Sequence, residues 1–137
     1  MRTQMVAVAI GSGALALTVG LAGPALADGN WAAASGSSST GDGGFGWGPN
    51  GKKEAESTAL QRCAGGQGNP KDCTIIASSA QCVAIATSPS NNLALAGGSG
   101  PTPSAASAAA VAALKGKGVS DAQVGQGNTA CGTDPVS

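Results

Sequence analysis

The sequence predicts an α+β domain, in which two strand–strand–helix–strand (ββαβ) halves form one sheet of about six strands with two helices on one face. Three observations favour this fold. Two alanine-rich stretches have the pattern of helices, and short apolar runs between Gly, Pro and Asn have the pattern of strands. Four cysteines are the number needed for two disulfides in a small exported domain.

The chain opens with a segment typical of a signal peptide. Arg2 supplies a positive charge, Met5 to Leu21 is an uncharged and mostly apolar run, and Ala25-Leu26-Ala27 is a signal-peptidase pattern. We therefore expect residues 1–27 to be removed. Residues 28–137 remain as one secreted domain, extracellular or in the cell envelope, with no membrane span after the leader is cleaved.

The mature part of the chain is nearly neutral. Of the seven Lys and Arg only Arg2 lies in the leader, whereas all seven Asp and Glu follow it, so the mature net charge is −1. Proteins that bind nucleic acid usually gather a basic excess on one surface. We therefore expect no nucleic-acid partner.

The first half has the expected order of two strands, a helix and a strand. Trp31 to Ala34 favours a strand, and Gly44 to Gly48 alternates glycine with aromatic residues, which suits a strand with one large face. Lys52 to Ala64 places small residues four apart and predicts a helix, with Asn50 as its N-cap. Thr74 to Ala77 predicts the third strand.

The second half repeats this order. Its strongest signal is Thr102-Pro103, an N-cap followed by proline at the first helical position, which begins a helix that ends near Lys115. Gly97 to Pro101 is expected to end the strand before this helix. The expected strands are Cys82–Thr87, Leu93–Ala96, a weaker one at Ala122–Val124, and Thr129–Cys131.

The two halves also resemble each other in sequence when the chain is shifted by about 50 residues. Trp31 to Ala34 then matches Cys82 to Ile85, and Lys52–Ala64 matches the second helix. This internal repeat is the reason for expecting two equivalent halves.

The four cysteines are expected to form structural bridges. Four cysteines allow three pairings, of which we favour Cys63–Cys73 with Cys82–Cys131. A zinc site is not expected, because the chain has no His and its cysteines lack the close pairs of structural zinc sites. No other metal site or cofactor is indicated.

Three motifs give the chain a family resemblance: Ala59-Leu60-Gln61-Arg62-Cys63, Asp72-Cys73-Thr74-Ile75-Ile76 and Gln81-Cys82-Val83-Ala84-Ile85-Ala86. Together with the final Ala-Cys pair, they resemble the family called domain of unknown function 4189, which consists of small secreted bacterial proteins. The matching stretch runs from Trp31 to Cys131. The resemblance implies export and a disulfide-bonded α+β domain, and it implies no particular activity and no catalytic residues. The Ser/Gly-rich first loop and the nearly uncharged second helix depart from the usual pattern.

The chemistry available to the chain does not favour catalysis. It contains no His and no Tyr, and its cysteines are expected to be bonded. Its serines are concentrated in loop sequence, and Glu54 and Glu56 lie two apart on a helix, where they point in different directions. We therefore expect a protein that is not an enzyme and has no catalytic residue.

The expected function is that of a secreted, non-catalytic binding module for a host or extracellular protein, including an enzyme that it inhibits. Its expected contact surface is a set of polar loops at Gly36–Gly44, Gln67–Lys71 and Ser88–Asn92. An alternative is a module for cell-wall or other glycans that uses Trp31 and Trp47, although the small number of large residues in the chain favours a core position for both. A second alternative is a small hydrolase without His.

Overall fold

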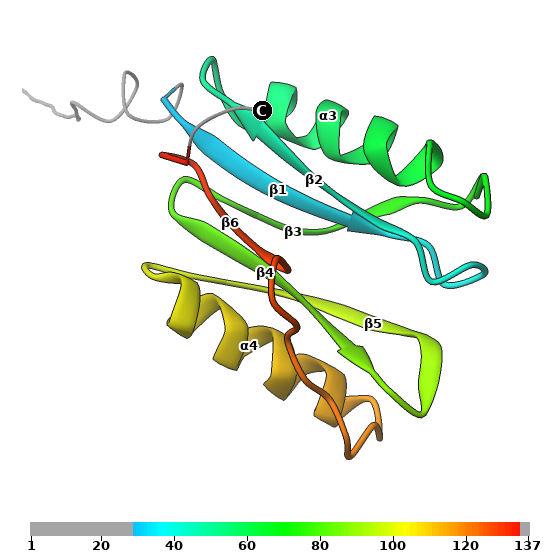
Figure 1. Cartoon of the computed structure of the whole chain (residues 1–137). Helices are drawn as coiled ribbons and strands as arrows, with labels where there is room; N and C mark the ends of the chain where they lie inside the picture. Colours follow the sequence, from blue (N-terminus) through cyan, green and yellow to red (C-terminus); the bar gives the residue numbers. More distant parts are fainter. Residues whose placement is uncertain (1–28, 135–137) are drawn as a thin grey trace, which may run out of the picture.

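The computed structural model describes residues 29–134, which form four layers in the order helix, sheet, sheet, helix (Figure 1). The signal peptide expected at residues 1–27 lies outside the described residues. The elements in chain order are β1 (Trp31–Gly36), β2 (Gly43–Gly48), α3 (Lys52–Ala64), β3 (Thr74–Ser79), β4 (Cys82–Ser88), β5 (Asn91–Gly100), α4 (Pro103–Gly116) and β6 (Thr129–Cys131).

The strands form two antiparallel sheets of three rather than one sheet of six. Their orders are β2-β1-β3 and β5-β4-β6, so each central strand pairs with both other strands of its own part of the chain. Helix α3 covers the outer face of the first sheet, and α4 covers the outer face of the second (Figure 1). The α+β class is confirmed, but the single sheet with both helices on one face is wrong.

The burial of the two central strands explains this arrangement. In β1, Ala33 packs against α3, while its neighbours Ala32 and Ala34 pack between the sheets. In β4, Val83 and Ile85 likewise point between the sheets, and the alternate residues face α4. A strand that is apolar on both faces needs a covering layer on each side. One helix supplies one layer, and the opposite sheet supplies the other.

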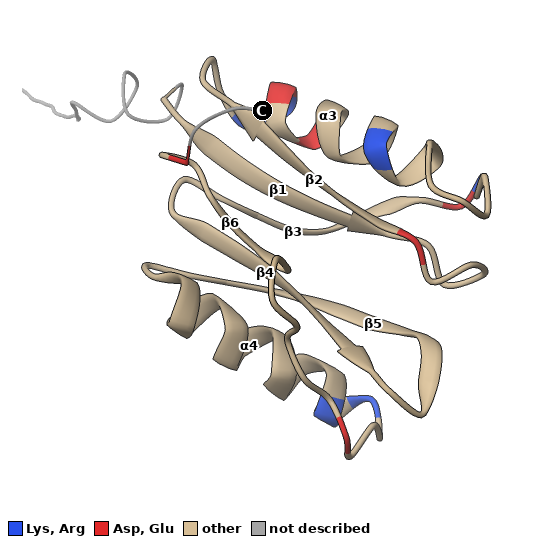
Figure 2. Cartoon of the chain, in the orientation of Figure 1, with Lys and Arg blue, Asp and Glu red and all other residues tan. Residues whose placement is uncertain are grey.

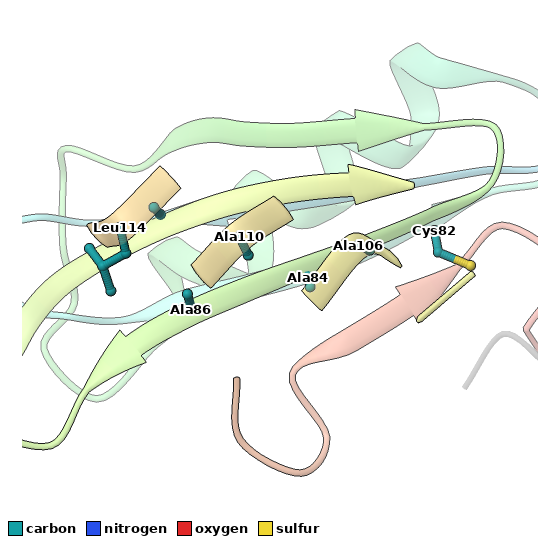
Figure 3. Close-up of a cluster of buried hydrophobic side chains, with 7 residues drawn as sticks. Cys82, Ala84, Ala86, Ala106, Ala110 and Leu114 are labelled. Carbon is teal, nitrogen blue, oxygen red and sulfur yellow. The ribbon is translucent and has the colours of Figure 1, made fainter. Parts of the chain in front are cut away.

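Small residues bring each helix close to its sheet. On β2, a Cβ atom built at Gly46 would lie 2.1 Å from the carbonyl oxygen of Ala55 in α3. On β5, a Cβ atom built at Gly98 would lie 2.2 Å from the nitrogen of Ala110 in α4. Figure 3 shows the alanines of α4 above those of β4, with Leu114 at one end of the row. The aromatic side chains of β2 and the larger side chains of β4 are directed instead into the space between the two sheets.

Most element boundaries agree with the sequence to within two residues, and three features differ more clearly. The N-cap of α3 is Gly51 rather than Asn50, whose backbone N–H donates to Glu54 Oε1 at 3.1 Å. Strand β5 continues to Gly100, because Gly98 and Gly100 lie against α4 and Gly97 lies against β3 instead of forming a turn. The strand expected at Ala122–Val124 is reduced to one isolated bridge between Gln123 and Thr87. The Thr102 cap is confirmed, since its side chain accepts a hydrogen bond from Ala105 N.

Candidate functional site

Both disulfides expected from the sequence are present in the structure. Cys63–Cys73 joins the last turn of α3 to the residue before β3. Cys82–Cys131 joins two residues that are directly paired between β4 and β6. All four thiols are therefore used for cross-links.

The two tryptophans lie on opposite faces of the first sheet. Trp31 packs partly against Ala33 and the alanines of α3, and the Nζ atom of Lys52 lies 5.8 Å from its ring centroid. Trp47 packs partly into the cluster between the sheets, and its Nε1–H donates to the carbonyl oxygen of Cys131 at 3.0 Å. The two rings do not form a shared platform.

Trp47 lines a cleft of about 390 Å³ between the two sheets. Phe45 and Trp47 point into this space because the alternate glycines of β2 face α3. The other apolar lining residues, Ile85 and Leu95, come from the second sheet. The remaining lining residues are Gly41, Gly43, Gly44, Arg62, Thr87, Gly127 and Asn128. We call this space the Trp47 cleft.

The shortness of β6 leaves room for the Trp47 cleft. Between the bridge at Gln123 and the start of β6, the chain turns away from β4, with Asn128 N donating to Gly125 O at 3.1 Å. Gly127 has φ 85°, a backbone conformation that favours glycine. In the first sheet, β3 has no such turn and pairs with β1 from Thr74 to Ser79.

The Trp47 cleft carries one cationic side chain and no acidic one among its lining residues. Arg62 of α3 reaches over β2, so that its Nη1 donates to the carbonyl oxygen of Phe45 at 3.2 Å. Its guanidinium carbon lies 5.2 Å from the Trp47 ring centroid. A planar guanidinium stacks favourably on an aromatic face. These two contacts hold a positive charge beside the apolar part of the cleft.

A second cluster of polar groups ties the first hairpin to the loop before β3. Ser37 Oγ donates to Asp72 Oδ1 at 2.5 Å, and Ser39 Oγ donates to the same oxygen at 2.9 Å. These hydrogen bonds, first that from Ser37, hold the pKa of Asp72 below its ordinary value of 3.8. The ionised carboxylate is stabilised in this position, which makes it a weaker proton acceptor.

The same arrangement occurs in the second part of the chain. Ser88 Oγ donates to Asp121 Oδ1 at 2.6 Å, and Ser90 N donates to Asp121 Oδ2 at 3.2 Å. Hydrogen bonds from Ser88 and then Ser90 lower the pKa of Asp121. Both clusters therefore act as anchors for hairpins.

The three loops expected as a contact surface meet at one end of the sheets. Gly68 N donates to Asp42 Oδ2 at 3.0 Å, which joins the α3–β3 loop to the first hairpin. A Cβ atom built at Gly41 would lie 2.2 Å from the carbonyl oxygen of Asn92 in the second hairpin. Figure 2 shows the charges of the described chain on α3 and near the ends of elements, with the strands of both sheets largely uncharged.

The sequence pattern does not identify several of the cleft residues as site residues. Phe45 was visible in the alternation of glycine with aromatic residues, which indicated one large face. Arg62 and Asn128 had no comparable signal. Their positions depend on the approach of α3 to β2 and on where β6 stops pairing with β4.

The fold and the cleft together describe a small α+β domain that is held by two disulfides and has a cleft between its two sheets. The chain belongs to the family "Domain of unknown function (DUF4189)", whose family model matches residues 31–131. No curated protein and no solved structure matches the chain.

Proposed function

We propose that this protein is a non-catalytic binding module that acts outside the cytoplasm and holds a group of its partner in the Trp47 cleft. The observation that carries the proposal is the cleft itself, which combines apolar walls with one positioned cation, Arg62. Ligand sites in proteins are commonly concave and mainly apolar, with a few polar groups that fix orientation. The two disulfides limit the flexibility of the scaffold, which lowers the entropic cost of association.

The absence of catalysis is part of this proposal. The sequence has neither His nor Tyr, and the four cysteines are bonded. Of the three buried serines in residues 29–134, Ser37 and Ser88 donate to carboxylates whose pKa is lowered, and such carboxylates are poor general bases. The third, Ser35, donates to the carbonyl oxygens of Gly44 and Ala59. These features support binding over the alternative of a small hydrolase.

An extracellular location is consistent with the two disulfides, since such bonds persist in oxidising compartments. Among residues 29–134, no helix has both the length and the apolar character needed to cross a membrane. Secretion through a cleaved signal peptide stays a prediction from the sequence, as does a protein partner.

We also propose that the two halves of the chain are an internal repeat. The helices support this, since Ala55, Ala59 and Cys63 are the buried residues of α3, and Ala106, Ala110 and Leu114 are those of α4. The two Ser–Asp anchors give further support, because each ties a hairpin to the loop that follows a helix. The turn before β6 has no counterpart in the first half. Its residues Gly127 and Asn128 line the Trp47 cleft.

The glycan-binding alternative has less support. A sugar platform needs an exposed aromatic face. Each tryptophan here is partly packed in a core cluster and has a cation over its ring, Lys52 for Trp31 and Arg62 for Trp47.

The proposed function is tested by mapping where small molecules bind. A fragment library of neutral, anionic, cationic and sugar compounds is screened against the ¹⁵N-labelled protein. We expect the hits to shift the signals of Phe45, Asn128 and the Trp47 indole N–H, which donates to Cys131 O. Hits scattered over the surface, or gathered on Trp31, would contradict a binding role for the Trp47 cleft.

A turnover assay tests the non-catalytic part of the proposal. Peptide, ester, glycan and peptidoglycan substrates should remain intact in the presence of excess purified protein. Turnover that survives purification and is abolished by Ser37→Ala or Ser88→Ala would instead favour the hydrolase.

A further inference from the structure

We infer that the ligand of the Trp47 cleft is a compact apolar carboxylate: a ring or branched apolar group that carries one carboxylate close to it. This inference rests on the proposed function and adds the chemical class of the ligand. Its basis is the juxtaposition of apolar walls with Arg62 in a space whose described lining contains no acidic residue.

The apolar part of the ligand is defined by the walls. Phe45 and Trp47 of the first sheet face a space that Ile85 and Leu95 of the second sheet also line. These side chains leave a volume of about 390 Å³, near the lower end of the range for ligand sites. The walls therefore suit one ring or one branched side chain, and burial of that group from water supplies the hydrophobic part of the affinity.

The charge of the ligand is defined by Arg62. Its guanidinium is held by the Phe45 carbonyl at 3.2 Å and by the Trp47 ring at 5.2 Å, so its direction is set by the fold. An arginine side chain carries five N–H donors in a plane and can bind a strand carbonyl and a carboxylate together. The fork of donors matches the two oxygens of a carboxylate, which is a strong, charge-assisted interaction.

Two further polar side chains line the cleft. Within residues 29–134, the side chains of Thr87 and Asn128 make no hydrogen bond, although the backbone groups of both residues are paired with neighbouring strands or turns. Each can donate to a carboxylate oxygen that Arg62 also holds. The lining thus offers donors and a positive charge beside the apolar walls, which selects against cations.

The experiment uses the emission of Trp47. The chain has two tryptophans and no tyrosine, so Trp31→Phe leaves Trp47 as the reporter. Trp31 lies on the other face of the sheet and does not line the cleft. This reporter protein is titrated with phenylacetate, with its neutral counterpart phenylacetamide, and with acetate, which lacks the ring. We expect saturable binding of phenylacetate, about tenfold weaker binding of phenylacetamide, and no saturation with acetate.

Charge variants in the reporter protein identify the side chain that causes the preference for phenylacetate over phenylacetamide. Arg62→Gln should remove the preference for phenylacetate over phenylacetamide, and Arg62→Lys should retain part of it. The matched control is Lys52→Gln, which removes the cation beside the ring at position 31, on the other face of the sheet, and should leave the preference unchanged. Circular dichroism and thermal melting of each variant verify that it is folded.

A second ligand pair identifies the source of the carboxylate. N-acetyl-phenylalanine carries the same groups as the C-terminal residue of a polypeptide. Tighter binding of this compound than of phenylacetate indicates a polypeptide C-terminus, and the reverse indicates a free small carboxylate. Both results support the inferred class.

Three outcomes would overturn the inference. The first is equal affinity for phenylacetate and phenylacetamide, and the second is a loss of preference in Lys52→Gln as large as that in Arg62→Gln. The third is the absence of binding by every carboxylate probe. If fragments of another class still map to the Trp47 cleft, the proposed function stands and only the carboxylate inference fails.

Discussion

Replacing Gly46 by alanine should test the close contact between β2 and α3. A Cβ atom at this position would lie 2.1 Å from Ala55 O and 2.5 Å from Ala59 N. Both atoms belong to the helix backbone, so no side chain can rotate to make space. Ordinary contact begins at 3.4 Å, and α3 must therefore move outward by about 1.3 Å, the difference between 3.4 and 2.1 Å.

The loss in the free energy of unfolding follows from this displacement of α3. Moving α3 loosens its packing on both β2 and β1, and overpacking of a well-packed interface costs about 3 kcal/mol at the upper end of the usual range. In a domain of this size, a loss of that magnitude lowers the melting temperature by about 15 °C. A strand does not disfavour alanine relative to glycine. The loss of stability in Gly46→Ala therefore measures the close contact between β2 and α3.

Urea unfolding, followed by tryptophan fluorescence, measures the change in the free energy of unfolding. The matched control is Gly116→Ala at the end of α4, where an added Cβ atom has nothing within 4 Å. This variant should be neutral or more stable by about 0.5 kcal/mol, because alanine is the better helix former. If Gly46→Ala and Gly116→Ala unfold at the same urea concentration, the reasoning about close packing is wrong.

Three further predictions concern stability. Removing the Cys82–Cys131 bridge, with sequence separation 49, should lower the free energy of unfolding by about 4 kcal/mol, and removing the bridge with separation 10 by about 3 kcal/mol; equal losses in urea unfolding would contradict the loop-length argument. Hydrogen bonds lower the pKa of Asp72 and Asp121 in the folded state, so the two ionised carboxylates add to the free energy of unfolding above pH 3.8. This added stability is lost as the pH falls through and below that value. Melting temperatures measured from pH 7 to pH 3 should therefore fall less steeply when both are changed to Asn, and an unchanged slope would count against these anchors. Thr102→Ala should cost about 1 kcal/mol by removing the N-cap of α4, and a stability equal to wild type would show that the cap is dispensable.

Local signals in the sequence were sufficient to identify both helices and most of the strands. Helix α3 has the predicted bounds Lys52–Ala64, because small residues at every fourth position identify one buried face. The Thr102-Pro103 pair likewise identified the start of α4. Strand β5 was predicted too short, since Gly97 to Gly100 was interpreted as a break. There Gly98 and Gly100 provide room for α4 and Gly97 for β3, which depends on contacts between residues far apart in the sequence.

The arrangement of the sheets and the site depended on long-range contacts. Alternation in β4 identifies a strand, but it does not show that Val83 and Ile85 face another sheet rather than a helix. Trp47 could be named from composition, because the chain has few large residues. Arg62 could not be identified as a site residue from the sequence, because its position over Trp47 depends on how far α3 lies from β2.

The position of the cleft along the chain has a consequence for synthesis. Most of its lining has been synthesised once Leu95 has been added, but the turn at Gly127 and Asn128 follows α4 and is made later. The bond from Trp47 to the carbonyl of Cys131 and the bridge from Cys82 to Cys131 are formed by these same late residues. Because the N-terminal part emerges first, a nascent chain exposes Phe45 and Trp47 before their covering segment exists. The proposed binding site is therefore complete only after residues 127–131 have been made.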